Sequence, residues 1–189
     1  MRRADWFPVL AVVLPPVALA AAGLPHPQDL TASDALVWRN IHLVALWLFP
    51  LLALAPWLVL RERHPRLAVV AAVLGYLFAC GYTALDVLAG IGAGGLALAG
   101  LPGEGVLFSL GRALALPAVI AYLAATVLAA LAAVATRRPI AVLGALLVVA
   151  GAVSFLTSHI YPPRGVITML VLAAGWAILV VARPREGRG

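Results

Sequence analysis

The sequence predicts an all-α integral membrane bundle of six transmembrane helices. Of its 189 residues, 65% are apolar and 11% are charged, whereas soluble domains are about half apolar and a quarter charged. The mean hydropathy is +1.09. A helix needs about 20 apolar residues to cross the hydrocarbon core of a membrane, so the chain accommodates about six spans with short loops. The whole chain, 1–189, is predicted to be a single transmembrane domain, with spans at about 6–24, 40–60, 67–90, 110–135, 140–159 and 166–182.

The first predicted span, 6–24, has two interpretations. A basic start, an apolar middle and the small residues Ala20–Ala22 are typical of a secretory signal peptide. The apolar run is long for the core of a signal peptide, however, and Asp5 lies in the basic segment. A retained first helix is therefore the interpretation we favour.

The second predicted span is followed by a cluster of arginines, and the third apolar run begins at Leu67. This run is too long for one straight span. We expect a helix to about Gly90 and then a glycine-rich turn or re-entrant segment that ends near Gly105. The spacing Gly90-x-x-x-Gly94 is also typical of closely packed helices, so both interpretations stay open.

The last three predicted spans are separated by short connections that contain proline. Arg137-Arg138-Pro139 follows the fourth span, and Tyr161-Pro162-Pro163 follows the fifth. Such short connections predict that neighbouring spans pack antiparallel.

The distribution of arginine predicts the orientation of the bundle. All thirteen basic residues are arginine, and cytoplasmic loops of membrane proteins carry an excess of such residues. With the N-terminus inside, ten arginines are cytoplasmic and three lie on the outer side. Both termini are therefore predicted to be cytoplasmic, in the inner (plasma) membrane of a cell. The inner ten are Arg2, Arg3, Arg61, Arg63, Arg66, Arg137, Arg138, Arg183, Arg185 and Arg188, and the outer three are Arg39, Arg112 and Arg164.

Composition also excludes several classes of function. The longest segment that is not strongly apolar, 25–38, is too short to fold as a soluble domain, which excludes an extramembrane ATPase, kinase or DNA-binding domain. The net charge of +6 is explained by arginines that flank the spans, so no nucleic-acid partner is predicted. The expected partners are the lipid bilayer and either a second copy or a membrane subunit. No motif assigns a catalytic residue, which disfavours an enzyme.

Ionisable side chains gather at one predicted depth in the membrane. At 1.5 Å per helical residue, His42, Asp86 and His159 lie near the outer ends of the second, third and fifth spans. Charged groups in or near hydrocarbon are costly and mark functional sites by default. The candidate binding layer at the outer leaflet consists of Asp86, Arg112, Arg39, His42, His159 and Tyr82.

The acidic member of this layer has three interpretations. Asp86 forms a structural ion pair with Arg112 or Arg39, is an exposed carboxylate at the interface, or accepts an ion or proton. Tyr82 precedes it by four residues and so shares its helix face. Arg39 and the histidine three residues later share a face in the same way.

The histidines also have alternative interpretations. His42 and His159 are side chains at the interface without a ligand, or they ligate a haem or a transition metal. No metal site and no cofactor is favoured. His26 and His64 each lie beside a proline, and we expect them to be loop residues. Trp38 lies near a span end and fits the belt of aromatic residues at a membrane surface.

Two stretches resemble segments of small polytopic bacterial membrane proteins to which no function is assigned. They are YTALDVLAGIGAG, at 82–94, and HIYPPRG, at 159–165. The resemblance implies a bacterial inner-membrane protein and implies nothing about its activity.

Three functions are consistent with these features. The one we favour is a binding or permeation protein for a small molecule or ion, with Asp86 as acceptor in a polar site at the outer leaflet. The second is a non-catalytic accessory subunit, held to a membrane partner through small-residue faces such as Ala93-x-x-x-Ala97. The third is a haem- or metal-dependent membrane redox protein with His42 and His159 as ligands.

Overall fold

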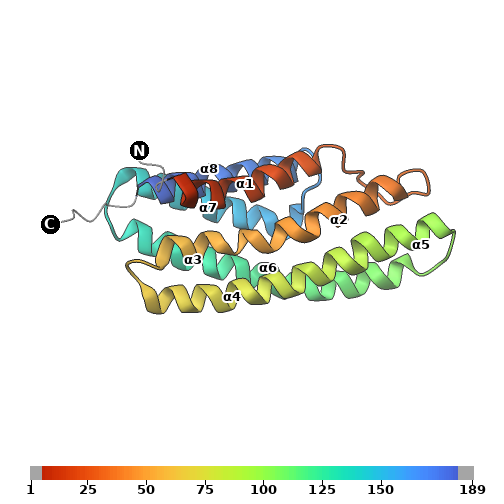
Figure 1. Cartoon of the computed structure of the whole chain (residues 1–189), viewed down its shortest axis with the longest axis horizontal. Coiled ribbons are helices and arrows are strands. Elements are labelled where there is room, and N and C mark those ends of the chain that lie inside the picture. Colours follow the sequence, from red (N-terminus) through yellow and green to blue (C-terminus); the bar gives the residue numbers. More distant parts are fainter. Residues whose placement is uncertain (1–5, 183–189) are drawn as a thin grey trace.

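The computed structural model describes residues 6–182, and this part of the chain folds into helices without a strand (Figure 1). Six helical stretches are long and apolar enough to cross a membrane, which agrees with the six predicted spans and the all-α class. The elements are α1 (Trp6–Gly23), α2 (Ala35–Leu52), α3 (Leu54–Leu60), α4 (Pro65–Leu85), the π-helix η2 (Asp86–Gly92), α5 (Ala93–Ala99), α6 (Glu104–Val134), α7 (Pro139–Ser158) and α8 (Arg164–Val181).

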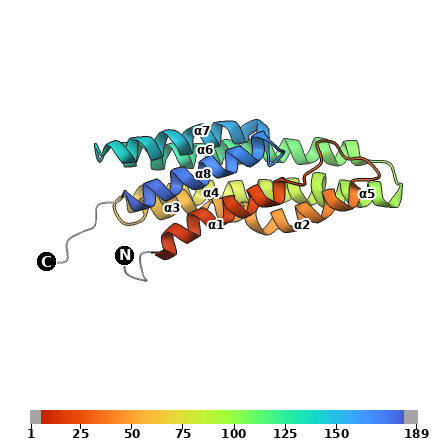
Figure 2. The ribbon, with the colours of Figure 1, turned by 90° about the horizontal axis from the view of Figure 1, so that it is seen from above.

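The six spans form a ring in sequence order (Figures 1 and 2). Helices α2 and α3 make the second span, and α4, η2 and α5 make the third. Each span packs against the next one along the chain, and α8 packs back against α1. The short connections thus join neighbours, as predicted. Helix α1 is part of the bundle, with Val12 and Leu19 buried against the other helices.

The connections lie at two ends of the bundle (Figure 1). One end holds the connections 24–34, 100–103 and 159–163, and we call it the histidine end. The other holds the connections 61–64 and 135–138, and we call it the arginine end. Consistent with this grouping, the side chain of Gln28 donates a hydrogen bond to the carbonyl of Pro162.

Two predicted span boundaries at the histidine end are wrong. The second span begins at Ala35 rather than near residue 40, and the fourth begins at Glu104 rather than near 110. The second prediction began the span just after Arg39, and the fourth began it two residues before Arg112. Both helices start about five residues earlier than these predictions, so each carries its arginine within the helix.

The glycine-rich segment is helical, and the turn expected after Gly90 does not form there. The chain continues through η2 and α5 and turns at residues 100–103, where Gly100 and Gly103 have φ angles of 65° and 125°. Gly90 and Gly94 face α2, at positions where a Cβ would collide with His42 and press on Arg39. Of the two interpretations, close helix packing is therefore the correct one.

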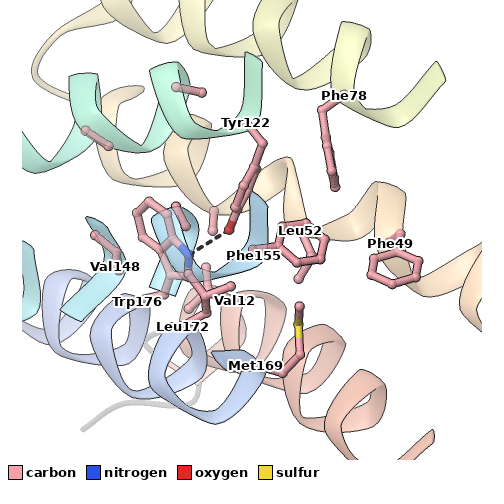
Figure 3. Packing of buried hydrophobic residues seen from close by; sticks show 14 of the residues in the cluster. Val12, Phe49, Leu52, Phe78, Tyr122, Val148, Phe155, Met169, Leu172 and Trp176 are labelled. Carbon is pink, nitrogen blue, oxygen red and sulfur yellow. Dashed lines mark hydrogen bonds between the residues drawn. The ribbon is translucent and has the colours of Figure 1, made fainter. Parts of the chain in front are cut away.

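The apolar core lies in the middle of the bundle and is rich in aromatic rings (Figure 3). Trp176 of α8 and Tyr122 of α6 are fully buried, and the Trp176 indole N–H donates a hydrogen bond to the Tyr122 hydroxyl over 3.2 Å. Phe155 of α7 packs beside Tyr122. This core fixes the relative position of α6, α7 and α8 beneath the polar residues at the histidine end.

Candidate metal site

Three of the four histidines of the chain converge at the histidine end. They are His26 from the connection between α1 and α2, His42 from α2, and His159, the residue after α7. One ring nitrogen from each lies within 4.8 Å of the corresponding atoms of the other two. The ring centroids are 5.1 to 5.8 Å apart. Three separate segments of the chain thus place imidazole rings around one point.

The position of His42 depends on the glycines of the third span. His42 and Arg39 are three residues apart on one face of α2, as predicted, and they lie over Gly90 and Gly94 respectively. A Cβ at Gly90 would overlap the His42 ring. The indole N–H of Trp38 also donates a hydrogen bond to the carbonyl of Ala89 in η2, over 3.0 Å. The close approach of α2 to η2 therefore holds the His42 ring in place.

His159 owes its position to an unusual backbone conformation. It follows the last residue of α7 with φ 45° and ψ −136°, a region that residues other than glycine rarely adopt and that clusters at functional sites. This conformation ends the helix and turns the ring toward the bundle interior. There its Nδ1 atom is hydrogen-bonded to the hydroxyl of Tyr82, at 2.7 Å.

The hydrogen bonds of the three rings leave one nitrogen available on each. His26 Nδ1 lies 2.7 Å from the carbonyl of Pro27, and His42 Nδ1 lies 2.9 Å from the carbonyl of Trp38. Carbonyl oxygens only accept hydrogen bonds, so both Nδ1 atoms carry the proton and both Nε2 atoms keep a lone pair. In the third ring, the His159 Nδ1 and the Tyr82 hydroxyl can each be the donor, and Nε2 keeps its lone pair when Nδ1 donates.

Two of the available nitrogens are buried without a partner. The Nε2 atoms of His26 and His159 make no hydrogen bond, and the His26 and His42 side chains are 3% and 2% exposed. Buried polar atoms normally have a hydrogen-bond partner. Two buried ring nitrogens without a partner, close to one another, therefore indicate a site that binds a ligand. Burial also lowers the pKa of His26 from its ordinary value of 6.5, and outweighs the Pro27 hydrogen bond that raises it. The ring is therefore neutral at pH 7, which is the form that binds metals.

A cavity of about 470 Å³ adjoins the histidines. His42, His159 and Tyr82 form part of its wall, and Arg112 and Tyr161 lie in the same lining. The rest of the wall is mainly apolar and aromatic, and consists of Trp38, Leu85, Ala89, Phe108, Ala115, Leu116, Val119, Phe155, Leu156 and Thr157. Cavities of this size with a few polar groups are typical of small-molecule sites.

Tyr161 connects the histidines with the charged residues around them. Its ring lies 4.6 Å from that of His26 and 5.2 Å from that of His159. Burial, together with the nearby Asp29, raises the pKa of Tyr161 to about 12, although Arg112 acts in the opposite direction. The phenol therefore stays protonated, and Arg112 lies close enough to the site to act on it.

The structure brings together some members of the predicted layer. His42, His159 and Tyr82 meet at one site, and Arg112 lines the adjoining cavity. Arg39 lies one turn away against Gly94, with its Nε atom buried and without a hydrogen bond, while its terminal nitrogen donates to the side chain of Asn40.

The ion pair expected for Asp86 is absent from the described residues. Its side chain is 0% exposed and neither carboxylate oxygen has a hydrogen-bond partner. The prediction that Asp86 pairs with Arg39 or Arg112 is thus wrong, and so is the alternative of an exposed carboxylate. Depth arithmetic places residues at one level but leaves their direction around the helix axis undetermined, and the guanidinium of Arg39 turns to Asn40 instead.

Sequence reasoning missed His26 and misplaced Trp38. His26 was expected to be a loop residue, and it lies in a loop, but one that folds over the helix ends and is buried there. Trp38 was assigned to the membrane surface, yet it is 3% exposed and supports His42 from below. The available signal was position, since the connection 24–34 lies at the same end as His42 and His159.

The geometry suits a transition-metal ion with three imidazole ligands. Imidazole is a preferred ligand of Zn²⁺ and Cu²⁺, and three nitrogens at about 2.0–2.1 Å from a tetrahedral ion lie about 3.4 Å apart. The nitrogens here are within 4.8 Å of one another, so binding requires ring movements of about an ångström.

No protein family model, no curated protein and no solved structure matches this chain.

Proposed function

We propose that this protein binds one transition-metal ion of the Zn²⁺ or Cu²⁺ class at the outer end of a multi-pass membrane bundle. The observation that carries the proposal is the convergence of His26, His42 and His159, each with Nδ1 engaged and Nε2 available. This proposal keeps the binding function favoured from the sequence but replaces Asp86 as the acceptor by the three histidines. It assigns His42 and His159 the ligand role that the sequence left as an alternative, and adds His26.

The three-histidine set leaves room for a fourth ligand. Zinc sites that act on substrates use three protein ligands and an open position, whereas structural zinc sites are closed by four. Here the wall that contains His42 and His159 faces the 470 Å³ cavity. An ion at this point therefore has an accessible coordination position, which favours a ligand-binding role over a purely structural one.

Tyr82 contacts a proposed ligand, His159, without contacting the ion itself. Metal-ligating histidines usually donate their other ring N–H to an oxygen, which fixes the tautomer and the ring orientation. The carbonyls of Pro27 and Trp38 accept in this way from two of the ligands, and the Tyr82 oxygen does so from the third.

The proposed orientation places the histidine end outside the cell membrane and both termini in the cytoplasm. Arg61, Arg63, Arg66, Arg137 and Arg138 lie at the arginine end of the described structure. The other five arginines predicted to be cytoplasmic fall outside the described residues. The excess of arginine at one end supports this orientation by the positive-inside rule, in the inner membrane of a bacterium.

The proposal is tested by titrating the purified full chain, in a non-ionic detergent and stripped of metal, with Zn²⁺. We expect one ion per chain by calorimetry and by elemental analysis after gel filtration. His26→Ala, His42→Ala and His159→Ala are each expected to weaken binding by about a hundredfold or more. His64→Ala is the matched control, because His64 is the fourth histidine, is exposed, and lies at the arginine end.

A stoichiometry far below one, or an equal loss in the His64→Ala variant, would contradict the proposed site. Each alanine variant is compared with the corresponding glutamine variant, which keeps a polar side chain of similar length. Circular dichroism and the gel-filtration profile identify variants that fail to fold, so a loss of metal is scored only for folded protein.

A further inference from the structure

The cavity beside the histidines has a polar end and an apolar end. Arg112, Ala115 and Val119 line it from successive turns of α6, because residues three and four apart share a helix face. Helix α6 begins at the histidine end, so Arg112 is nearest to that end and Val119 is about two turns deeper. On α7 the order is the same, with His159 at the end and Phe155 one turn deeper. The polarity of the lining thus changes along the bundle axis.

The cavity reaches the lateral surface of the bundle between α6 and α7. Leu116 of α6 lines it and is 56% exposed, and Thr157 of α7 lines it and is also exposed. In a bundle that spans a membrane, the Leu116 side chain faces lipid, while the Thr157 hydroxyl accepts a hydrogen bond from the exposed Arg164. An occupant can therefore enter from the bilayer without crossing the aqueous surface.

The charge at the polar end favours an anion. Arg112 is a permanent cation, and no carboxylate appears in the cavity lining. Asp86 is buried nearby and Asp29 lies near Tyr161, but both are absent from that lining. A bound divalent ion would add positive charge at the same end. A carboxylate or phosphate group can interact with both cations, since its oxygens ligate transition metals and accept charge-assisted hydrogen bonds from a guanidinium.

We propose that the cavity binds an anionic amphiphile from the outer leaflet, with an oxygen of its headgroup as the fourth metal ligand. Arg112 pairs with the headgroup, and the apolar tail lies along Ala115 and Val119 toward Phe155. This inference rests on the proposed metal site. It names the class of ligand that the open coordination position receives.

The test uses the full chain in non-ionic detergent, loaded with Co²⁺ so that the coordination is visible in the absorption spectrum. The probe is dodecanoate, and the comparisons are methyl dodecanoate, which lacks the charge, and acetate, which lacks the tail. We expect dodecanoate alone to bind at micromolar concentration and to shift the visible Co²⁺ bands.

Variants separate the two ends of the cavity. Arg112→Gln is expected to weaken dodecanoate binding by about tenfold or more, since a hydrogen bond to a charged group is lost, with Co²⁺ binding retained. Arg66→Gln is the control, because it makes the same change of charge at the arginine end. Ala115→Phe fills the apolar end and is expected to abolish dodecanoate binding, again with Co²⁺ retained.

The possible failures are distinguishable. If Co²⁺ binds in a one-to-one ratio but dodecanoate leaves the spectrum unchanged, the inference is wrong and the metal site stands. If methyl dodecanoate binds as well as dodecanoate, or if Arg112→Gln and Arg66→Gln behave alike, the headgroup assignment is wrong. If Co²⁺ does not bind, the proposed function fails and the inference fails with it.

Discussion

The Gly90→Ala substitution is expected to disable the metal site although Gly90 carries no ligand. A Cβ added to Gly90 would overlap the His42 ring and its Cβ, closer than the 3.0 Å limit that real Cβ atoms respect. Because η2 packs along α2 at this point, either the ring rotates away or the two helices separate. Both responses displace the Nε2 atom of His42 relative to His26 and His159.

The size of the effect follows from the contact. To restore a normal contact distance to the added Cβ, the His42 ring must move by about an ångström. This displacement is as large as the movement that the three histidines need in order to close on an ion. Removing the support of a ligating histidine typically costs 10–100-fold in metal affinity, and we expect a loss in that range. Overpacking also costs about 1–3 kcal/mol of stability, reduced by the roughly 0.5–1 kcal/mol that alanine gains over glycine in a helix.

The assay is the Zn²⁺ titration together with thermal unfolding followed by circular dichroism. Gly95→Ala is the matched control, since a Cβ at Gly95 meets no atom within 4 Å. The control is expected to keep the metal affinity and to be equally or slightly more stable. Its helix, α5, directly continues η2, so both substitutions change the same helical span.

Equal metal affinity in the Gly90→Ala and Gly95→Ala variants would refute the reasoning. It would mean that the site tolerates a shift of His42, and hence that the ring is not held by the approach of α2 to η2. A loss of affinity in both variants would instead point to a general softening of the third span.

Three further substitutions separate the site from the rest of the bundle. Tyr82→Phe removes the hydrogen bond to His159 and is expected to lower Zn²⁺ affinity by about tenfold, measured by calorimetry, and to cost about 1 kcal/mol in thermal unfolding without metal. Asp86→Asn replaces a buried carboxyl group without a partner by an amide of the same shape that is equally unpartnered. It is expected to change the unfolding free energy by less than about 1 kcal/mol and to leave Zn²⁺ affinity unchanged, and a large loss of Zn²⁺ binding would contradict this. Trp176→Phe removes the hydrogen bond to Tyr122 and leaves a cavity at a buried position. It is expected to cost about 2–3 kcal/mol in thermal unfolding, with Zn²⁺ affinity unchanged.

The number of spans and the depth of the site in the membrane follow from the sequence because each depends only on distance along the helix axis. Hydrophobic length sets the number of crossings, and the rise per residue sets how deep a side chain lies. These two quantities placed His42 and His159 at one level, and the four-residue spacing to Asp86 added Tyr82. The structure brings these three residues together.

The direction of a side chain around its helix is a second dimension that the sequence alone does not determine. The level of Asp86 does not decide whether it faces Arg39 or Arg112, and it contacts neither in an ion pair. The π-helix adds to this difficulty. It changes the angle between successive side chains from Asp86 onward. Counting 3.6 residues per turn therefore no longer predicts which residues share a helix face beyond that point.

The position of a loop residue such as His26 cannot be predicted from helix depth at all. Depth arithmetic applies to helices, and His26 lies in a connection whose path is set by tertiary contacts such as that between Gln28 and Pro162. A polar loop residue is normally assigned to water. Here the loop covers the helix ends, and the buried ring finds its surroundings in Trp38, His42 and Tyr161.

The same physical constraint explains why small residues and unusual backbone gather around the histidines. Three rings can share one point only if the segments that carry them approach more closely than ordinary side chains allow. Gly90 permits this for α2 and η2, and the positive φ of His159 permits it for the end of α7. Each feature costs conformational freedom or strain. The close packing of α2 on η2 accounts for Gly90 by itself, whereas a positive φ at a residue other than glycine adds nothing to helix packing. The strained backbone of His159, beside buried ring nitrogens that have no partner, therefore favours a site that binds a ligand there.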